Sequence, residues 1–255
     1  MTHWIRFEHD ARVGFGTLEG DTIHVHDGDL FNAPRRTGEA LARAAVRLLT
    51  PCTPTKMVAL WNNYRALAAK LAQAEPAEPL WFLKANSAFH PGEAPIRVPP
   101  SYSGKVVYEG ELGVVIGRRA ARVSEEDASA HIFGYTCIND VTAIDLLKKD
   151  VTFDQWSRAK SFDTFGVFGP VIATGLDPAT LVVRTVLNGQ ERQNYPVADA
   201  FFPPARLVSL ISQDLTLEPG DVIACGTSVG VGSMKPGSDV AVTIEGIGTL
   251  ANRYE

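Results

Sequence analysis

The residues best suited to chemistry are two glutamates separated by one residue in an apolar stretch. Glu109 and Glu111 lie within residues 107–117, where β-branched residues and a dense apolar run predict a strand. Because side chains alternate along a strand, both carboxylates point to the same face. On a mostly buried strand they repel each other and lose solvation, and a divalent cation is the simplest compensation. For this stretch alone, the alternative is a half-exposed edge strand with two solvated glutamates.

A third carboxylate and a glycine-rich loop are further candidates. Asp140 follows the strand predicted at residues 132–138 and precedes a short helix predicted at 142–149, so it is a candidate site residue or a helix N-cap. Residues 226–232 follow a strand and carry three glycines, and their backbone amides could bind an anion. No Gly-Lys-Ser/Thr and no βαβ unit follow them, which argues against a P-loop and a dinucleotide site.

Short strands dominate the elements that must position these groups. Residues 4–26 predict a small β meander with His24 and His26 at its surface, and residues 38–49 predict a helix. A Pro-rich stretch then divides a small N-terminal α/β subdomain, residues 1–50, from a main domain, residues 55–255. Regular βαβ alternation is absent, so we expect an α+β fold built around a rolled or sandwiched sheet with short helices.

Composition narrows the class of protein. The formal net charge is −5 and no basic block is present, which argues against nucleic acid or a membrane as partner. No apolar run approaches the ~20 residues of a membrane span. The three cysteines, Cys52, Cys137 and Cys225, are far apart and fit reduced, buried side chains. The first residues lack the basic-then-apolar pattern of a signal peptide, so we expect a cytoplasmic protein.

Between residues 58 and 254 the chain resembles the fumarylacetoacetate hydrolase family, because many short sequence blocks match those of the family and occur in the same order. The resemblance covers most of the main domain and rests on many blocks rather than on one motif. The blocks include Tyr108-Glu109-Gly110-Glu111-Leu112, Gly134-Tyr135-Thr136 before Asn139-Asp140, Ala159-Lys160, Gly169-Pro170, Asn188-Gly189, Glu218-Pro219-Gly220-Asp221 and Gly226-Thr227.

The resemblance implies a mixed β-roll, usually a homodimer, with one Mg²⁺ or Mn²⁺ held by Glu109, Glu111 and Asp140. A small 2-oxo acid or dienoate would chelate that metal, which stabilises an enolate as a Lewis acid. Lys160 matches the family's lysine at the reacting oxygen. The remaining matches have two implied roles: substrate binding for Thr227, Gly226, Gln193, Asn63 and Tyr64, and support of the metal ligands for Tyr135 and Asn139.

Departures from the family pattern bear on the reaction. Hydrolytic members carry a His and a Glu on a mobile helix to activate water, but those positions hold Leu67 and Lys70 here. His90, in a Pro-rich loop, is an alternative base. Ile144 and Leu147 stand where many members have Arg and Gln, which puts recognition of a second carboxylate in doubt.

Isomerisation or decarboxylation fits the missing His–Glu pair better than hydrolysis. The resemblance therefore points to a metal-dependent enzyme similar to one acting on 2-hydroxyhepta-2,4-diene-1,7-dioate. The alternatives are an acylpyruvate- or fumarylacetoacetate-type hydrolase and a non-catalytic, metal-dependent binder of 2-oxo acids.

Overall fold

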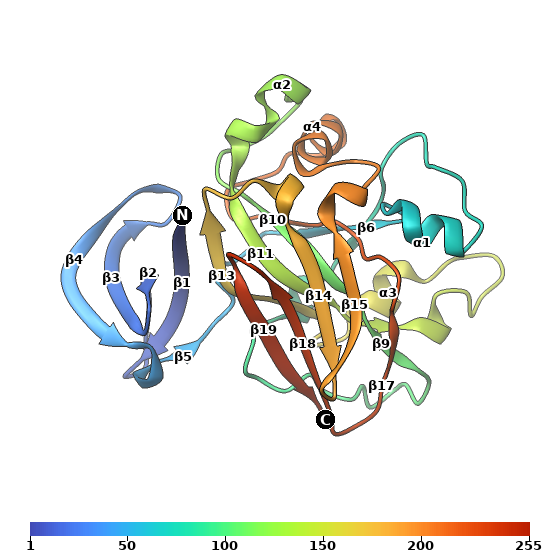
Figure 1. Cartoon of the computed structure of the whole chain (residues 1–255), viewed down its shortest axis with the longest axis horizontal. Helices are drawn as coiled ribbons and strands as arrows, with labels where there is room; N and C mark the ends of the chain where they lie inside the picture. Colours follow the sequence, from blue (N-terminus) through green and yellow to red (C-terminus); the bar gives the residue numbers. More distant parts are fainter.

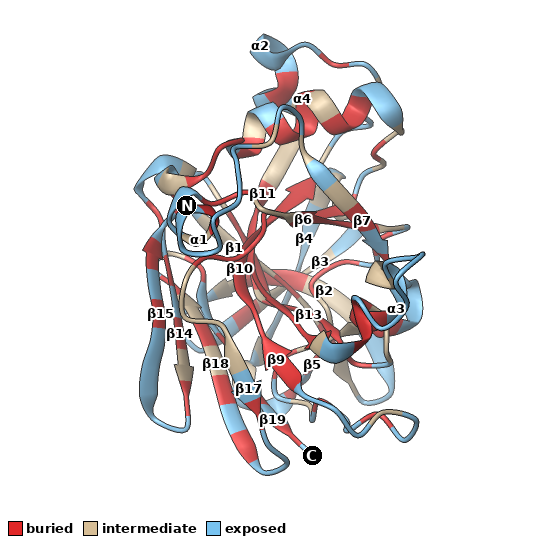
Figure 2. Ribbon diagram, turned by 90° about the vertical axis from the view of Figure 1, so that its right-hand side faces the viewer, coloured by how far each residue is buried: buried red, intermediate tan, exposed pale blue.

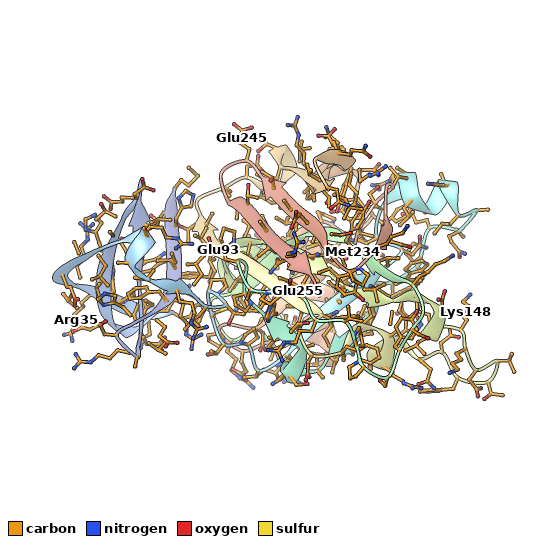
Figure 3. The ribbon with its side chains drawn as sticks, turned by 90° about the horizontal axis from the view of Figure 1, so that it is seen from below. Arg35, Glu93, Lys148, Met234, Glu245 and Glu255 are labelled. Carbon is orange, nitrogen blue, oxygen red and sulfur yellow. The ribbon has the colours of Figure 1, made fainter.

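The computed structural model describes all 255 residues, and its N-terminal part is a four-stranded antiparallel meander. Its strands are β1 (Thr2–His9), β2 (Arg12–Glu19), β3 (Thr22–Asp29) and β4 (Asn32–Ala42). β1 also pairs with β13 (Gly166–Thr174), so the meander extends the main sheet outward. It forms one end of the molecule (Figure 1), and its Arg35 lies at the opposite end of the long axis from Lys148 (Figure 3).

The prediction of a helix at residues 38–49 was wrong. That segment contains the end of β4, a 3-10 turn at Arg43–Ala45 and the short strand β5 (Arg47–Leu48), which pairs with β1. β4 pairs along β3, where Leu41 lies opposite Ile23, and Gly38 takes a positive φ that a helix does not accommodate. Backbone pairing at the sheet edge therefore prevails over helical spacing of apolar residues.

The main sheet has 12 strands and passes through the middle of the molecule. After β13 it continues through β11 (Ile132–Asp140), β10 (Gly110–Ile116), β16 (Val222–Ala224), β6 (Met57–Trp61) and β7 (Leu80–Lys84), while β8 (Phe89–His90) pairs with β13. β10 is buried along its whole length (Figure 2). Leu112, Val114 and Ile116 join the larger core on one face and Val115 a smaller core on the other, which explains the unbroken apolar run.

Two smaller sheets complete a rolled arrangement. One contains β15 (Gln190–Pro196), β14 (Val182–Leu187), β18 (Ser238–Ile244) and β19 (Gly248–Tyr254), and the other contains β12 (Thr142–Ala143), β9 (Val106–Tyr108) and β17 (Gly232–Met234). The α-helices are short: α1 (Arg65–Lys70), α2 (Glu125–Ala128), α3 (Trp156–Lys160) and α4 (Pro204–Asp214). Short 3-10 turns lie at Asn86–Ala88, Ser129–His131, Ile144–Leu146, Pro178–Thr180 and Val197–Asp199. The predicted α+β class, with many strands and few short helices, is confirmed.

None of the helices combines the length and the apolar character needed to cross a membrane.

A buried aspartate fixes the junction between the start of the main domain and the central sheet. Asp221 Oδ1 accepts hydrogen bonds from the backbone amides of Thr55 and Lys56 and from the Thr55 hydroxyl, at 2.7–3.0 Å. Its Oδ2 accepts from the Glu218 amide at 2.7 Å and from Lys56 Nζ at 2.5 Å. This carboxylate thus anchors the residues that lead into β6. β6 and β16 are parallel neighbours in the main sheet.

Replacing Asp221 with Ala should therefore destabilise the fold. The change leaves three backbone amides without their acceptor, so we expect the free energy of unfolding to fall by about 3 kcal/mol or more. Urea unfolding followed by circular dichroism measures this. Asp21→Ala, at an exposed turn, is the control, and equal stability of both variants would contradict this role for Asp221.

Candidate metal centre

The register of two central strands brings the carboxylates together. The single strand expected at residues 107–117 is divided at Glu109, which lies between β9 of one sheet and β10 of another. β10 pairs antiparallel with β11, placing Gly110 opposite Asn139 at the end of β11. The Asp140 amide donates to the Glu109 carbonyl at 2.8 Å, so Asp140 lies directly beside Glu109.

Carboxylate oxygens of Glu109, Glu111 and Asp140 all lie within 4.8 Å of one another, and all three residues are buried. Lys160 Nζ donates to Glu109 Oε2 at 2.7 Å and to Asp140 Oδ2 at 2.6 Å. Lys84 Nζ donates to the other Asp140 oxygen, and the Thr142 hydroxyl donates to Glu109 Oε1 at 2.9 Å. The positive charges of two ammonium groups thus partly compensate the negative charges of three carboxylates.

The remaining negative charge falls on Glu111. Its Oε2 accepts a hydrogen bond from the Gly226 amide at 2.8 Å, whereas its buried Oε1 has no hydrogen-bond partner. Burial raises the pKa of Glu111 well above its ordinary value, and the charges of Asp140 and Glu109 add to this rise. Burial also raises the pKa of Glu109, although Lys160 opposes that effect. For Asp140 burial is outweighed by Lys160 and Lys84, which together lower its pKa.

This donor set fits a metal ion. Three buried carboxylates, one with an unpartnered oxygen, offer the hard oxygen ligands that divalent cations of the Mg²⁺ type prefer. The carboxylates hydrogen-bonded to lysine retain further lone pairs for coordination. Glu109, Glu111 and Asp140, which the sequence singled out, can therefore hold a metal at this point.

The glycine-rich loop, residues 226–232, contacts Glu111 and the backbone of β10. Gly226 has a φ of +88°, a conformation suited to glycine, and this directs its amide at Glu111. The Thr227 hydroxyl donates to the Gly110 carbonyl at 2.9 Å. Gln193 accepts from the Gly110 amide at 3.0 Å and donates to Thr227 Oγ1 at 2.8 Å. These residues hold the β10 backbone and border the cluster.

Three other residues that the sequence singled out, Asn139, Asn63 and Tyr64, differ in how they relate to the carboxylate cluster. Asn139 Oδ1 accepts from the Glu109 amide at 3.1 Å and so supports the cluster. The Asn63 amide is used by backbone groups of Phe202 and Cys225. Tyr64 is fully buried with an unpartnered hydroxyl, and its ring meets Tyr195 edge-on at 4.9 Å.

No hydrogen bond or ion pair joins Tyr135 or His90 to the carboxylates, and no histidine belongs to the cluster of possible metal ligands. Tyr135 lies five residues before Asp140 on β11, roughly 16 Å along the strand, and makes no hydrogen bond to the cluster. His90 forms part of β8, and its ring makes no ion pair with the carboxylates. Burial lowers the pKa of His90.

Lys84 is the residue of the cluster that the sequence analysis missed. Its side chain is completely buried at the end of β7 and contacts Asp140. The available signal was a lysine that ends an otherwise apolar run of five residues, on the same strand face as buried Phe82. Burial lowers the pKa of Lys84 despite the opposing charge of Asp140.

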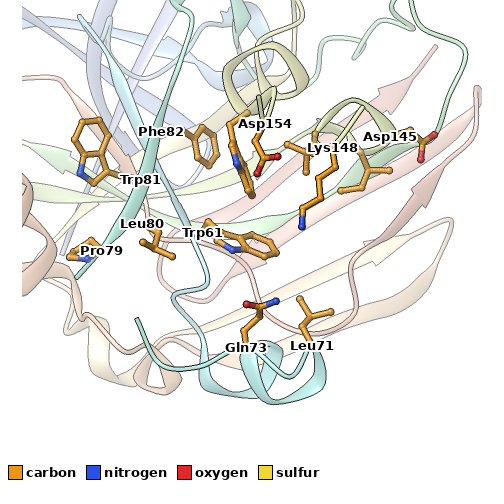
Figure 4. A pocket seen from close by; sticks show the side chains of 13 residues that line it. Trp61, Leu71, Gln73, Pro79, Leu80, Trp81, Phe82, Asp145, Lys148 and Asp154 are labelled. Carbon is orange, nitrogen blue, oxygen red and sulfur yellow. The ribbon is translucent and has the colours of Figure 1, made fainter. Parts of the chain in front are cut away.

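An apolar cleft of about 920 Å³ is lined by 13 residues, none of which belongs to the carboxylate–lysine cluster (Figure 4). Phe82 lines this cleft, and Lys160 Nζ lies 5.3 Å from the centre of the Phe82 ring. Ile144 and Leu147 also line it, as does Trp156 from the helix that carries Lys160. Phe82 and Trp156 therefore connect the cluster to a space large enough for a small organic molecule.

Two family models together match nearly the whole chain. Residues 56–255 match the model described as "Fumarylacetoacetate (FAA) hydrolase C-terminal", and residues 2–51 match one described as "Rv2993c-like, N-terminal". The chain belongs to the fumarylacetoacetate hydrolase family, as its sequence blocks indicated.

The proteins similar to this chain include an isomerase, a tautomerase and a hydrolase. A 2-hydroxyhepta-2,4-diene-1,7-dioate isomerase from Mycobacterium marinum has a TM-score of 0.91 and 39% identity, covering 100% of this chain and 98% of that one. An oxaloacetate tautomerase from Bacillus subtilis is 34% identical, covering 92% of this chain and 83% of that protein. A maleylpyruvate hydrolase from Sphingobium sp. SYK-6, in complex with manganese(II) and pyruvate, has a TM-score of 0.80 and 26% identity, covering 99% and 98%.

Glu111→Gln should stabilise the metal-free protein and abolish its response to metal. Removing a buried charge with no counter-ion should raise the melting temperature in EDTA by about 3 °C or more. The advantage should grow with pH above the ordinary range of a glutamate, because a raised pKa lets the folded state bind a proton that the unfolded state releases.

Differential scanning fluorimetry in EDTA and in MnCl₂ measures both effects. The unmodified protein and Glu245→Gln, an exposed control, should gain melting temperature with Mn²⁺. A Glu111→Gln variant that keeps the full Mn²⁺ shift would contradict metal binding at this cluster.

Proposed function

We propose that the protein is a Mg²⁺- or Mn²⁺-dependent isomerase, tautomerase or decarboxylase of 2-oxo or 2-hydroxy-dienoic acids. The observation that carries this proposal is the buried cluster of three carboxylates and two lysines beside a cleft. The reactions of the similar isomerase and tautomerase fall in the same class.

The charges of the cluster suit an anionic substrate. Three carboxylates and two ammonium groups leave one negative charge, since −3 + 2 = −1. A bound divalent cation would make the total +1 and would polarise the 2-oxo group as a Lewis acid. Glu109, Glu111 and Asp140 would hold that cation in a pocket largely removed from water, where electrostatic attraction to a carboxylate is strong.

In this proposal Lys160 acts on the substrate oxygen. An ammonium group has three N–H donors, and Lys160 uses two of them for Glu109 and Asp140. Those carboxylates outweigh the effect of burial and raise the pKa of Lys160, so it stays charged. Its third N–H can donate to the oxygen on which negative charge develops.

The proposed reactions need no activated water. In tautomerisation a proton leaves C3 of the 2-oxo acid and a proton is added to its oxygen. In decarboxylation the C–C bond breaks, carbon dioxide leaves, and the electron pair moves into the enolate before C3 takes a proton. Hydrolysis needs a base for water, and α1 offers only Leu67 and exposed Lys70 at the expected positions.

Hydrolysis of an acylpyruvate remains the second candidate, because one similar protein is a maleylpyruvate hydrolase. A non-catalytic binder of 2-oxo acids is a candidate of another class. Metal-dependent turnover of any 2-oxo acid separates the binder from the enzymes, and the choice of substrate separates the two enzymes.

Lys160→Met tests the proposed role of the lysine. The change keeps the length of the side chain and removes the charge, so kcat should fall by on the order of 10²-fold or more. The assay is run at saturating Mn²⁺, with Lys149→Met as an exposed control. An unchanged kcat would remove Lys160 from the mechanism.

A comparison of substrates tests the proposed reaction class. With Mg²⁺ or Mn²⁺, we expect faster tautomerisation or decarboxylation of oxaloacetate than hydrolysis of acetylpyruvate, both followed by absorbance. The double change Leu67→His with Lys70→Glu should raise the hydrolysis rate, since general-base assistance contributes ~10²–10⁴-fold. Efficient acetylpyruvate cleavage by the unmodified protein that survives His90→Ala would favour the hydrolase instead.

A further inference from the structure

We propose that the cleft beside the carboxylates binds the tail of the substrate, and that this tail is uncharged and apolar, preferably aromatic. The inference rests on the proposed function and adds the substrate class. It predicts a 2-oxo acid whose carboxylates all lie at the metal end and whose other end is a hydrocarbon group.

The cleft and the cluster are two ends of one site, because the same elements line both. On β7, Phe82 and Lys84 lie two residues apart and so share a strand face, with Phe82 in the cleft and Lys84 on Asp140. On α3, Trp156 and Lys160 lie one helical turn apart, with Trp156 in the cleft and Lys160 in the cluster.

A series of aromatic contacts joins the two ends. Trp61 and Trp156 have ring centroids 5.2 Å apart, and Trp156 stacks on Phe82 at 5.4 Å. Lys160 Nζ then lies 5.3 Å from the centre of the Phe82 ring. A tail that extends from the carboxylates past Phe82 into the cleft would therefore meet aromatic faces.

The lining favours hydrocarbon over a second carboxylate. Eight of the 13 lining residues are hydrophobic, and they include Trp61, Trp81, Phe82, Trp156, Ile144 and Leu147. No arginine lines the cleft, and its one ammonium group, on Lys148, is accompanied by the carboxylates of Asp145 and Asp154.

The three charged groups do not form an anion site. The Asp145 carboxylate accepts from the Lys105 amide at 2.9 Å and from the Tyr102 hydroxyl at 3.2 Å. Lys148 is exposed, and its side chain extends toward Trp61 in Figure 4. A far carboxylate would meet two like charges and one solvated cation, whereas an aromatic ring would remove apolar surface from water.

The size of the cleft also points to a tail. About 920 Å³ lies within the range of pockets that enclose drug-sized ligands, much more than pyruvate or oxaloacetate requires. A short 2-oxo acid would occupy the metal end and leave the aromatic walls uncovered.

The test compares the binding of three 2-oxo acids to the Mn²⁺-loaded protein by isothermal titration calorimetry. Pyruvate has no tail, 2-oxoglutarate has a charged tail, and 4-phenyl-2-oxobutanoate has an aromatic tail. We expect 4-phenyl-2-oxobutanoate to bind about 10-fold more tightly than pyruvate, and 2-oxoglutarate no more tightly than pyruvate.

Variants test whether the difference in affinity between these acids arises in the cleft. Trp61→Ala should weaken the phenyl compound about 10-fold and leave pyruvate unchanged, while Phe153→Ala, an exposed residue outside the cleft, should change neither. Tighter binding of 2-oxoglutarate than of the phenyl compound, lost in Lys148→Met, would overturn the inference and leave the proposed function standing. Failure of all three acids to bind would instead overturn the proposed function, and with it this inference.

Discussion

Burying three carboxylates at one point is unfavourable in free energy, and the surrounding residues are arranged to offset it. The antiparallel register of β10 and β11 places Glu109 next to Asp140, and β10 itself carries Glu111. Like charges this close are tolerated only with compensating positive charge. Lys160 and Lys84 supply most of it, and the Gly226 amide donates to Glu111. One negative charge remains, on the glutamate with an unpartnered oxygen, and that remainder is why the cluster suits a divalent cation.

The sequence predicted the parts of this arrangement that depend on local pattern. The expected alternation placed Glu109 and Glu111 together, although the strand is divided at Glu109, and the end of a strand placed Asp140. The role of Lys84 could not be predicted in this way, because it depends on which strands become neighbours in a sheet whose order does not follow the chain. The helix expected at residues 38–49 failed for a related reason, since pairing with β3 is a contact between strands rather than a property of the segment.

Polarity is divided sharply across the site. Within the site, the metal end contains the buried charges, which receive hydrogen bonds from lysines, a threonine and a backbone amide. The cleft end is lined by indole and phenyl rings, and Phe82 and Trp156 connect the two. Such a division would fix the reacting carboxylate by electrostatics and select the rest of the molecule by burial, so reaction and specificity would depend on different residues.

Anomalous diffraction from a crystal soaked in MnCl₂ tests the central claim most directly. The account predicts one strong manganese peak at ~2.0–2.3 Å from oxygens of Glu109, Glu111 and Asp140, with Glu111 Oε1 as one of the ligands. A manganese peak elsewhere, with these three carboxylates still bound only to Lys84, Lys160 and Gly226, would contradict it.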